Sequence, residues 1–257
     1  MTNNEIWRIA LQQSAYDCNC TPEDFFKDEH IITISKPHPK ARKYLPLPFA
    51  CDLVSYGSNI VAQTNEALAP LVQAYISKYP TEHCFETPHL HALDDLLHDH
   101  GLKVCFMAEY FLPDVEQLNP LPCPYELRIL HQEDFSEIYT PEWSDALCEH
   151  RKELDILGVG AYDGNQLVGL AGCSADCEMM YQIGVNVLPG YRRQGIASAV
   201  TSRLALEIFA LGKVPFYCAA WCNIKSVRNA IRCGFRPAWV EVTARDTALV
   251  DKLNRKD

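Results

Sequence analysis

The alternation of hydrophobic and polar residues predicts a regular succession of strands and helices in the second half of this chain. An alternating stretch predicts a strand over residues 125–130, and two apolar runs around the turn Asp163-Gly-Asn-Gln166 predict a hairpin. The polar, acidic stretch between them predicts one or two helices over residues 131–153. The remaining predicted elements are a strand at 180–187, a helix from 195 to about 211, a strand at 214–221, a helix from 223 to about 233 and a strand at 235–243.

The N-terminal half has a less regular pattern. It predicts an amphipathic helix over residues 4–16, a short helix capped by Thr21 and a proline-rich loop over residues 37–48. A strand at 49–54, a helix at 65–78, a short strand at 83–86, a helix at 89–100 and a strand at 102–110 are expected to follow. Because the prolines between residues 113 and 124 are typical of a linker, we predict two domains: an N-terminal α/β domain over residues 1–120 and a second domain over residues 125–247.

Composition narrows the class of protein. The chain has 257 residues, of which 48% are hydrophobic, and this is enough for a substantial core. It holds no run of about 18 apolar residues and does not begin like a signal peptide, so we expect a cytoplasmic protein with no membrane partner. In that setting the 12 cysteines are expected to be reduced and mostly buried, because the cytoplasm keeps thiols reduced. None of them are spaced as in a zinc finger.

Charge is unevenly distributed along the chain. The net charge of −10 argues against a nucleic-acid partner, yet residues 182–236 carry eight basic residues and one acid. A basic segment beside an acidic remainder suits an anionic cofactor and a cationic amine substrate. The alternative is that the acidic surface only maintains solubility.

The strongest chemical signal is the loop between the strand at 180–187 and the helix that follows. Arg192, Arg193, Gln194 and Gly195 lie where a strand gives way to a helix. Such a loop aims main-chain N–H groups and the positive end of a helix dipole at one point, which is how proteins bind phosphate. Gly195 allows close approach of the backbone, so we predict a phosphate or pyrophosphate site; the alternative is an ordinary helix cap.

This loop, as Arg192-x-x-Gly195-x-Ala197, resembles the acyl-CoA signature of the GNAT acyltransferase superfamily. Downstream, the segment from Asn223 through Ser226 to Pro237 is also similar to that family, and the predicted element order over residues 125–245 is the GNAT order. The resemblance implies an α/β (α+β) GNAT acyl-CoA N-acyltransferase fold with an additional N-terminal α/β domain. The two halves of the chain also resemble each other when they are compared at an offset of 133 residues. At this offset Gly101 corresponds to Gly234, and Ala62, where another helix is expected to begin, corresponds to Gly195. We therefore predict a degenerate half-GNAT domain over residues 30–115, without a CoA loop.

The resemblance implies an N-acetyltransferase that moves an acetyl group from acetyl-CoA to a primary amine of a small molecule or peptide, by direct attack. The strand at 180–187 would bind pantetheine through its main chain, and the loop would bind pyrophosphate. The residues implied in CoA binding are Val185, Asn186, Val187, Arg192, Arg193, Gln194, Gly195, Ile196, Ala197, Ser198 and Asn223.

The catalytic positions depart from the family pattern. The family's common glutamate corresponds to Gln182, which cannot act as a base but can orient a water; Glu178, with Asp176, is the candidate to carry the amine proton away through water. The family's common tyrosine corresponds to Ala230. Ser226 is then the candidate donor to the leaving thiolate, unless it only completes the Asn223 cap. Tyr217 and Tyr181 are alternative donors.

These departures keep other functions open. A catalytically weak acyl-CoA-binding protein with a regulatory or assembly role is the main alternative, and a redox or metal protein built on the cysteines and histidines is a third. The histidines between residues 83 and 100 are expected to lie on an exposed helical face, and no metal is expected. The assembly is expected to be a monomer or a homodimer.

Overall fold

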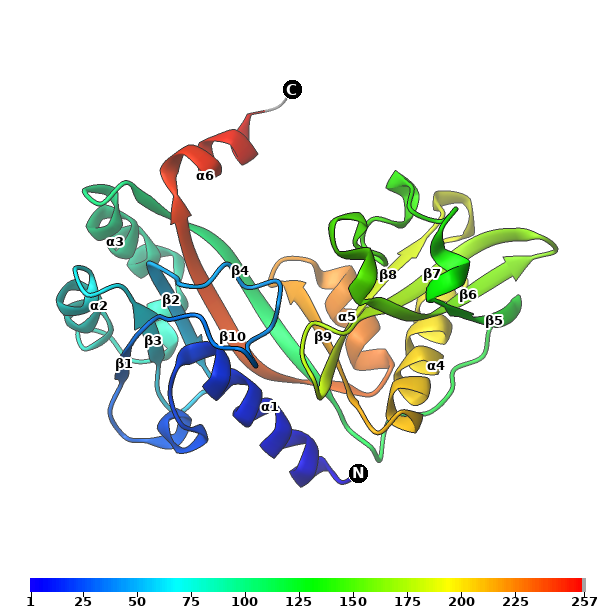
Figure 1. Cartoon of the computed structure of the whole chain (residues 1–257), viewed down its shortest axis with the longest axis horizontal. Helices are drawn as coiled ribbons and strands as arrows, with labels where there is room; N and C mark the ends of the chain where they lie inside the picture. Colours follow the sequence, from blue (N-terminus) through cyan, green and yellow to red (C-terminus); the bar gives the residue numbers. More distant parts are fainter. Residues whose placement is uncertain (256–257) are drawn as a thin grey trace. The chain divides into compact units, whose positions relative to one another are not determined.

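The chain forms two compact units in a computed structural model that describes residues 1–255 (Figure 1). The first unit comprises Met1–Ala10 and Phe111–Pro237, and the second comprises Leu11–Tyr110 and residues 238–255. The expected boundary near residues 120–125 differs from this division. Helix α1 (Asn3–Cys18) and strands β4 (Leu102–Pro113) and β10 (Phe235–Asp246) each contribute residues to both units.

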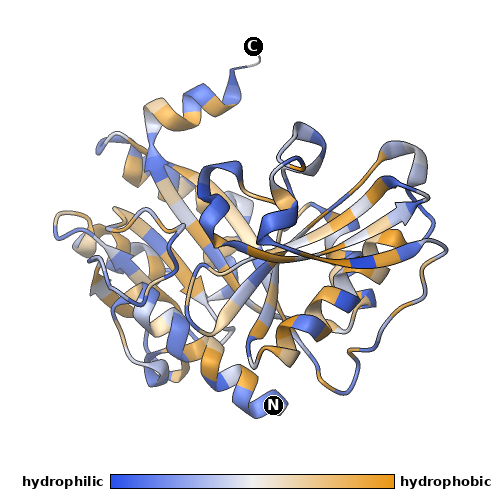
Figure 2. Cartoon of the chain, turned by 45° about the vertical axis from the view of Figure 1, so that its right-hand side comes forward, coloured by the Kyte–Doolittle hydropathy of each residue, from blue (hydrophilic) through white to orange (hydrophobic). Residues whose placement is uncertain are grey.

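The first unit is built on antiparallel strands in the order in which they follow along the chain. They are β5 (Glu126–His131), β6 (Asp155–Asp163), β7 (Gln166–Ser174) and β8 (Met180–Val187), and β9 (Val214–Ala220) then pairs parallel to β8. Helix α4 (Ile196–Ala210) packs on β6, β7 and β8, and α5 (Ile224–Arg232) packs on α4 and β9. Figure 2 shows orange and blue residues mixed along α4, whose buried residues include Val200, Leu204 and Ile208. The apolar face of α4 and the strands beneath it make the core of this unit.

Residues 131–154 are not α-helical, and the prediction of one or two helices there was wrong. The segment forms the short 3-10 helices η3 (Gln132–Phe135), η4 (Pro141–Trp143) and η5 (Glu149–Leu154). Pro141 disfavours a helical conformation at the residue before it, and Arg151 has the non-helical angles φ −144° and ψ 45°. The segment is held by packing instead, because Phe135, Trp143 and Leu147 form a buried cluster with Leu170 of β7.

The second unit has its own core, built on strands that pair with one another. Strand β1 (Ile31–Ile34) pairs parallel with β3 (Val61–Thr64), β3 pairs antiparallel with β2 (Cys51–Ser55), and β2 pairs antiparallel with β10. Helices α2 (Ala69–Ile76) and α3 (Thr87–His98) pack their apolar residues against this sheet in a second core. The remaining elements are η1 (Pro22–Phe26), η2 (Glu82–Phe85) and α6 (Thr247–Asn254).

Two predictions for the N-terminal half were wrong. Ala62, where a helix was expected to begin, lies in β3, all four residues of which are buried between β1 and β2. Residues 83–86 were expected to form a strand, but they lie in and just after the 3-10 helix η2, where Cys84 is buried. In both cases tertiary packing overrides a weak local preference. The likeness between the two halves of the chain stays a prediction.

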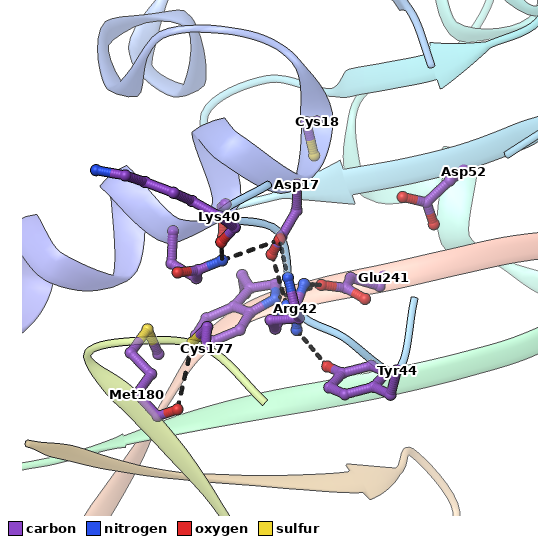
Figure 3. A network of polar contacts seen from close by, with 12 residues as sticks. Asp17, Cys18, Lys40, Arg42, Tyr44, Asp52, Cys177, Met180 and Glu241 are labelled. Atoms are coloured by element: carbon purple, nitrogen blue, oxygen red, sulfur yellow. Dashed lines mark hydrogen bonds and ion pairs between the residues drawn. The ribbon is translucent and has the colours of Figure 1, made fainter. Parts of the chain in front are cut away.

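A buried ionic network lies in the second unit (Figure 3). The Arg42 side chain, 3% exposed, donates from Nε to Asp17 Oδ2 at 2.5 Å and from Nη2 to Glu241 Oε1 at 2.6 Å. Its Nη1 donates to the Tyr44 hydroxyl at 2.6 Å, and the Trp239 indole also donates to Glu241. The Arg42 guanidinium therefore forms ion pairs with two buried carboxylates, and its Nε, Nη1 and Nη2 atoms each donate a hydrogen bond.

Candidate functional site

A pocket of about 590 Å³ lies in the first unit, where β8, the following loop, the start of α4 and the β9–α5 connection meet. Most of the residues implied in CoA binding line it. The lining residues are Asp145, Val185, Asn186, Val187, Tyr191, Arg192, Arg193, Gly195, Ile196, Ala197, Ser198, Tyr217, Asn223, Lys225, Ser226, Arg228, Asn229 and Arg232.

One wall of the pocket is an open strand edge. The registered pairs between the parallel strands β8 and β9 end at Ile183 and Tyr217, whereas β8 stays paired with β7 as far as Val187. Along residues 184–187 the main-chain groups on the β9 side of β8 are therefore not used by a neighbouring strand. Such groups favour an extended ligand that can hydrogen bond as a further strand would.

The loop after β8 has the geometry of an anion cradle. Arg193 and Gly195 have positive φ values of 64° and 84°, and Gly195 is the N-cap of α4. This alternation of conformations makes a nest of N–H groups at the helix N-terminus. Arg192 Nε donates to the carbonyl of Val187 at 3.0 Å and so ties the loop to β8. The first turn of α4 approaches β7 closely, because a Cβ at Gly169 would overlap the side chain of Ile196.

The charge of the pocket supports binding of an anion. Five cationic side chains line it, and they come from the loop and from α5: Arg192, Arg193, Lys225, Arg228 and Arg232. Asp145 is the one carboxylate among the described lining residues. The pocket is thus strongly positive apart from one position.

Two hydroxyl groups meet at the inner end of the pocket. The Tyr217 hydroxyl and Ser226 Oγ lie 2.8 Å apart, and either can donate the hydrogen bond. Burial raises the pKa of Tyr217, although the hydrogen bond with Ser226 opposes this, so the phenol remains protonated near neutral pH. Asn223 Oδ1 accepts from the Ser226 N–H at 3.3 Å. Ser226 therefore both completes the helix cap and lies beside a second hydroxyl.

A polar link connects α4 with α5 behind these hydroxyls. Ser198 Oγ donates to Asn229 Oδ1 at 2.9 Å, and Asn229 Nδ2 donates to Thr201 Oγ1 at 3.1 Å. Asn229 lines the pocket but carries no local motif, so the sequence offered no signal for it. The link holds the start of α4 at a set distance from the Tyr217–Ser226 pair.

Three of the predicted site residues do not line the pocket. Gln194 accepts a hydrogen bond from the Tyr125 hydroxyl at 3.0 Å. Gln182 donates to Cys218 Sγ at 3.0 Å, and Glu178 is exposed, with its carbonyl accepting from Lys213 at 2.8 Å. The roles predicted for these three residues stay predictions.

Asp145 is another pocket residue that sequence reasoning missed. It lies after η4, in the segment expected to be helical, and Asn186 of β8 holds its carboxylate and its main chain. A usable signal was present in the two glycines Gly172 and Gly184, which are cross-strand partners in β7 and β8. A Cβ at either position would overlap the main chain at residues 145–146.

The cysteines and histidines are the residues on which a metal or redox function would depend. All twelve cysteines are free, and burial raises the pKa of Cys173 and of Cys233 to about 12. Over residues 1–255 no group of three His, Cys, Asp or Glu side chains is arranged to hold a metal ion. In the same range no helix is both long and apolar enough to cross a membrane.

A family model described as GNAT acetyltransferase matches residues 73–238. A GCN5-related N-acetyltransferase from Kribbella flavida matches with a TM-score of 0.48 and 18% identity, over 60% of this chain and 63% of its own. A GCN5-related N-acetyltransferase-like protein from Streptococcus suis matches with a TM-score of 0.45 and 20% identity, over 62% of this chain and 69% of its own. A Salmonella typhimurium protein solved with acetyl-CoA matches with a TM-score of 0.34 and 16% identity, over 48% of this chain and 93% of its own. No curated protein matches the chain.

Proposed function

Because the chain belongs to the GNAT acetyltransferase family, we propose that it transfers an acetyl group from acetyl-CoA to a primary amine of a small molecule or a peptide. One observation carries the proposal: an anion cradle, an open strand edge and a hydroxyl pair line the same pocket. Each of these three features matches one part of the donor, namely its pyrophosphate, its pantetheine arm and its thioester sulfur.

In this proposal the donor lies along the pocket from the cradle to the hydroxyl pair. The pyrophosphate binds the N–H groups of residues 195–198 and the guanidinium groups of Arg192 and Arg193. The pantetheine arm runs beside β8 and bonds with the main chain of residues 185–187. A main-chain N–H on this edge polarises the thioester carbonyl and stabilises the negative charge that develops on its oxygen.

The transfer itself is a direct displacement. The amine nitrogen forms a bond to the carbonyl carbon, the carbon–sulfur bond breaks, and the sulfur leaves as a thiolate. Tyr217, hydrogen-bonded to Ser226, donates a proton to that thiolate and regains one from solvent through Ser226. The neutral amine loses one proton to solvent water in the same sequence, so that the products are a neutral amide and CoA.

The proposal is tested by measuring binding and turnover separately. Acetyl-CoA binding is measured by titration calorimetry, and release of free CoA is followed with a thiol reagent while a broad panel of primary amines is added. Turnover of one or more amines supports the enzyme. Binding without CoA release from any amine refutes it and supports the acyl-CoA-binding alternative, which predicts the same affinity for the donor.

The cradle is tested with the double variant Arg192→Glu, Gly195→Glu. Each change adds a negative charge beside the expected pyrophosphate, and a side chain at Gly195 also strains a backbone with φ of 84°. We expect acetyl-CoA binding to fall below detection. Arg203→Glu is the matched control, because Arg203 lies on α4 but pairs with Glu207 and does not line the pocket. Binding that survives in the double variant shows that the cradle is not the phosphate site.

A cytoplasmic location forms part of this proposal. It is supported by the twelve free cysteines, because disulfides are rare where glutathione keeps thiols reduced.

A further inference from the structure

Asp145 is held at the pocket by an unusually complete set of hydrogen bonds from one side chain. Asn186 Oδ1 accepts from the N–H groups of Asp145 and Ala146, at 2.9 and 2.8 Å. Asn186 Nδ2 donates to Asp145 Oδ2 at 2.8 Å. The amide therefore sets both the path of the loop and the orientation of the carboxylate.

The strands beneath the loop are shaped to receive it. Gly184 and Gly172 are cross-strand partners, and on the same face of the sheet Asn186 is the partner of Leu170. A Cβ at Gly184 would overlap the Asp145 carbonyl oxygen, and one at Gly172 would overlap the Ala146 carbonyl oxygen. The two glycines let residues 145–146 lie directly on β7 and β8, which brings the Asp145 carboxylate to the pocket.

The Asp145 carboxylate carries the opposite charge to its surroundings. Five cationic side chains line the same pocket, yet no ion pair joins Asp145 to another residue in the described part of the chain. Its fixed partner is a neutral amide, which orients the carboxylate without neutralising its charge. The residue is also exposed, and the hydrogen bond from Asn186 uses only Oδ2 of its carboxylate.

We infer that Asp145 is the binding site for the positively charged amino group of the acceptor, with Asn186 as its positioning residue. The inference rests on the proposed function and narrows its substrate class. A bound acyl-CoA would neutralise the cationic end of the pocket with its phosphates and leave Asp145 as the one charged group able to attract the acceptor. The acceptor is then an aliphatic amine, which is an ammonium ion at neutral pH, in preference to an arylamine, which is neutral there.

The test uses the whole protein loaded with CoA and a readout that needs no turnover. Benzylamine, tyramine and spermidine are titrated while the side-chain amide signal of Asn186 is followed by NMR, and benzyl alcohol serves as the neutral counterpart of benzylamine. We expect a saturable shift with an ammonium probe and none with benzyl alcohol. Asp145→Asn should weaken the binding about tenfold or more, since it removes a charge-assisted hydrogen bond but keeps the shape of the side chain.

Glu142→Gln is the matched control, because Glu142 is an exposed carboxylate on the same segment that does not line the pocket. It should leave ammonium binding unchanged. Acetyl-CoA affinity should stay the same in both variants, and where turnover is seen Asp145→Asn should raise the amine KM. Equal binding of the probes by wild type and Asp145→Asn, equal shifts with benzyl alcohol, or no shift with any of the three amines overturns the inference. Ammonium binding that depends on Asp145, without CoA release from any amine, instead retains the Asp145 site and refutes only the transferase.

Discussion

Replacement of Arg42 by Met should strongly destabilise the second unit. The guanidinium lies within hydrogen-bond distance of both Asp17 and Glu241, and the side chains of all three residues are 6% exposed or less. Methionine fills a similar volume but leaves two buried carboxylates without a cation. The cost of the change therefore comes mainly from the charges that remain and only slightly from lost packing.

The magnitude follows from the two buried ion pairs that the substitution breaks. Removing one partner of a buried ion pair typically costs about 3–5 kcal/mol, and here two pairs share the cation. The guanidinium also lies 5.4 Å from the Tyr110 ring centroid and 6.0 Å from that of Trp239, and each such interaction is worth roughly 0.5–2 kcal/mol. We expect a decrease of about 4 kcal/mol or more in the free energy of unfolding at pH 7, which is a large part of the roughly 5–15 kcal/mol of a typical domain.

Urea unfolding followed by circular dichroism and tryptophan fluorescence measures this decrease. Arg128→Met is the control, because Arg128 pairs with Glu126 at the surface, where solvent screens the pair, and its loss should change the free energy of unfolding far less. Burial already raises the pKa of Asp17, and removing the cation raises it further, so the deficit should shrink as pH falls and Asp17 takes up a proton. A decrease below about 1 kcal/mol at pH 7, or a deficit that grows on acidification, would refute the reasoning.

Two further predictions concern single residues of the first unit. Burial raises the pKa of Asp155 to about 6, so the folded protein binds this proton more tightly than the unfolded chain does. The free energy of unfolding should therefore fall as pH rises from 4 through 6. Asp155→Asn should remove roughly 2 kcal/mol of that fall, as measured by urea midpoints across this range. An unchanged pH slope in the variant would exclude Asp155 as its source. Tyr217→Phe should lower kcat about 100-fold while acetyl-CoA affinity stays within about threefold, and Ser226→Ala should have a smaller effect; equal kcat in Tyr217→Phe and wild type would exclude Tyr217 as the proton donor.

The local pattern of the chain predicted much of the first unit. The strand at 180–187 has the same bounds in the structure, and α4 and α5 lie within the ranges expected for them. The cap at Asn223 is present, with its side chain accepting from Ser226 N–H. These elements were predictable because the strands have a continuous apolar or alternating pattern and the helices end at Gly212 and Gly234. The GNAT family was predicted from the same residues, and the family model that matches residues 73–238 confirms it. The predicted α/β class agrees with the helices and strands of the structure.

Where long-range packing decides the structure, the sequence was a poor guide. Strand β3 has only four residues and is stabilised by pairing on both sides, so nothing within it distinguishes it from the start of a helix. The segment from residue 131 to 154 has a polar, helix-like composition, yet its 3-10 turns are held by Phe135 and Trp143 packing onto the sheet. In both cases interactions with residues far along the chain outweigh a weak local propensity.

The sequence by itself determined the family and the conformation of the loop after β8, because each depends on residues that are neighbours along the chain. Arg193 and Gly195 shape that loop through their own positive φ values. Only the tertiary structure decided which side chains line the pocket together. Tyr217 and Ser226 are hydrogen-bonded although they are nine residues apart in the sequence. Asn186 is hydrogen-bonded to Asp145 although 41 residues separate them, and the glycines of β7 and β8 leave room for this contact. Such pairs arise from packing of one element on another, and that information is absent from any local pattern.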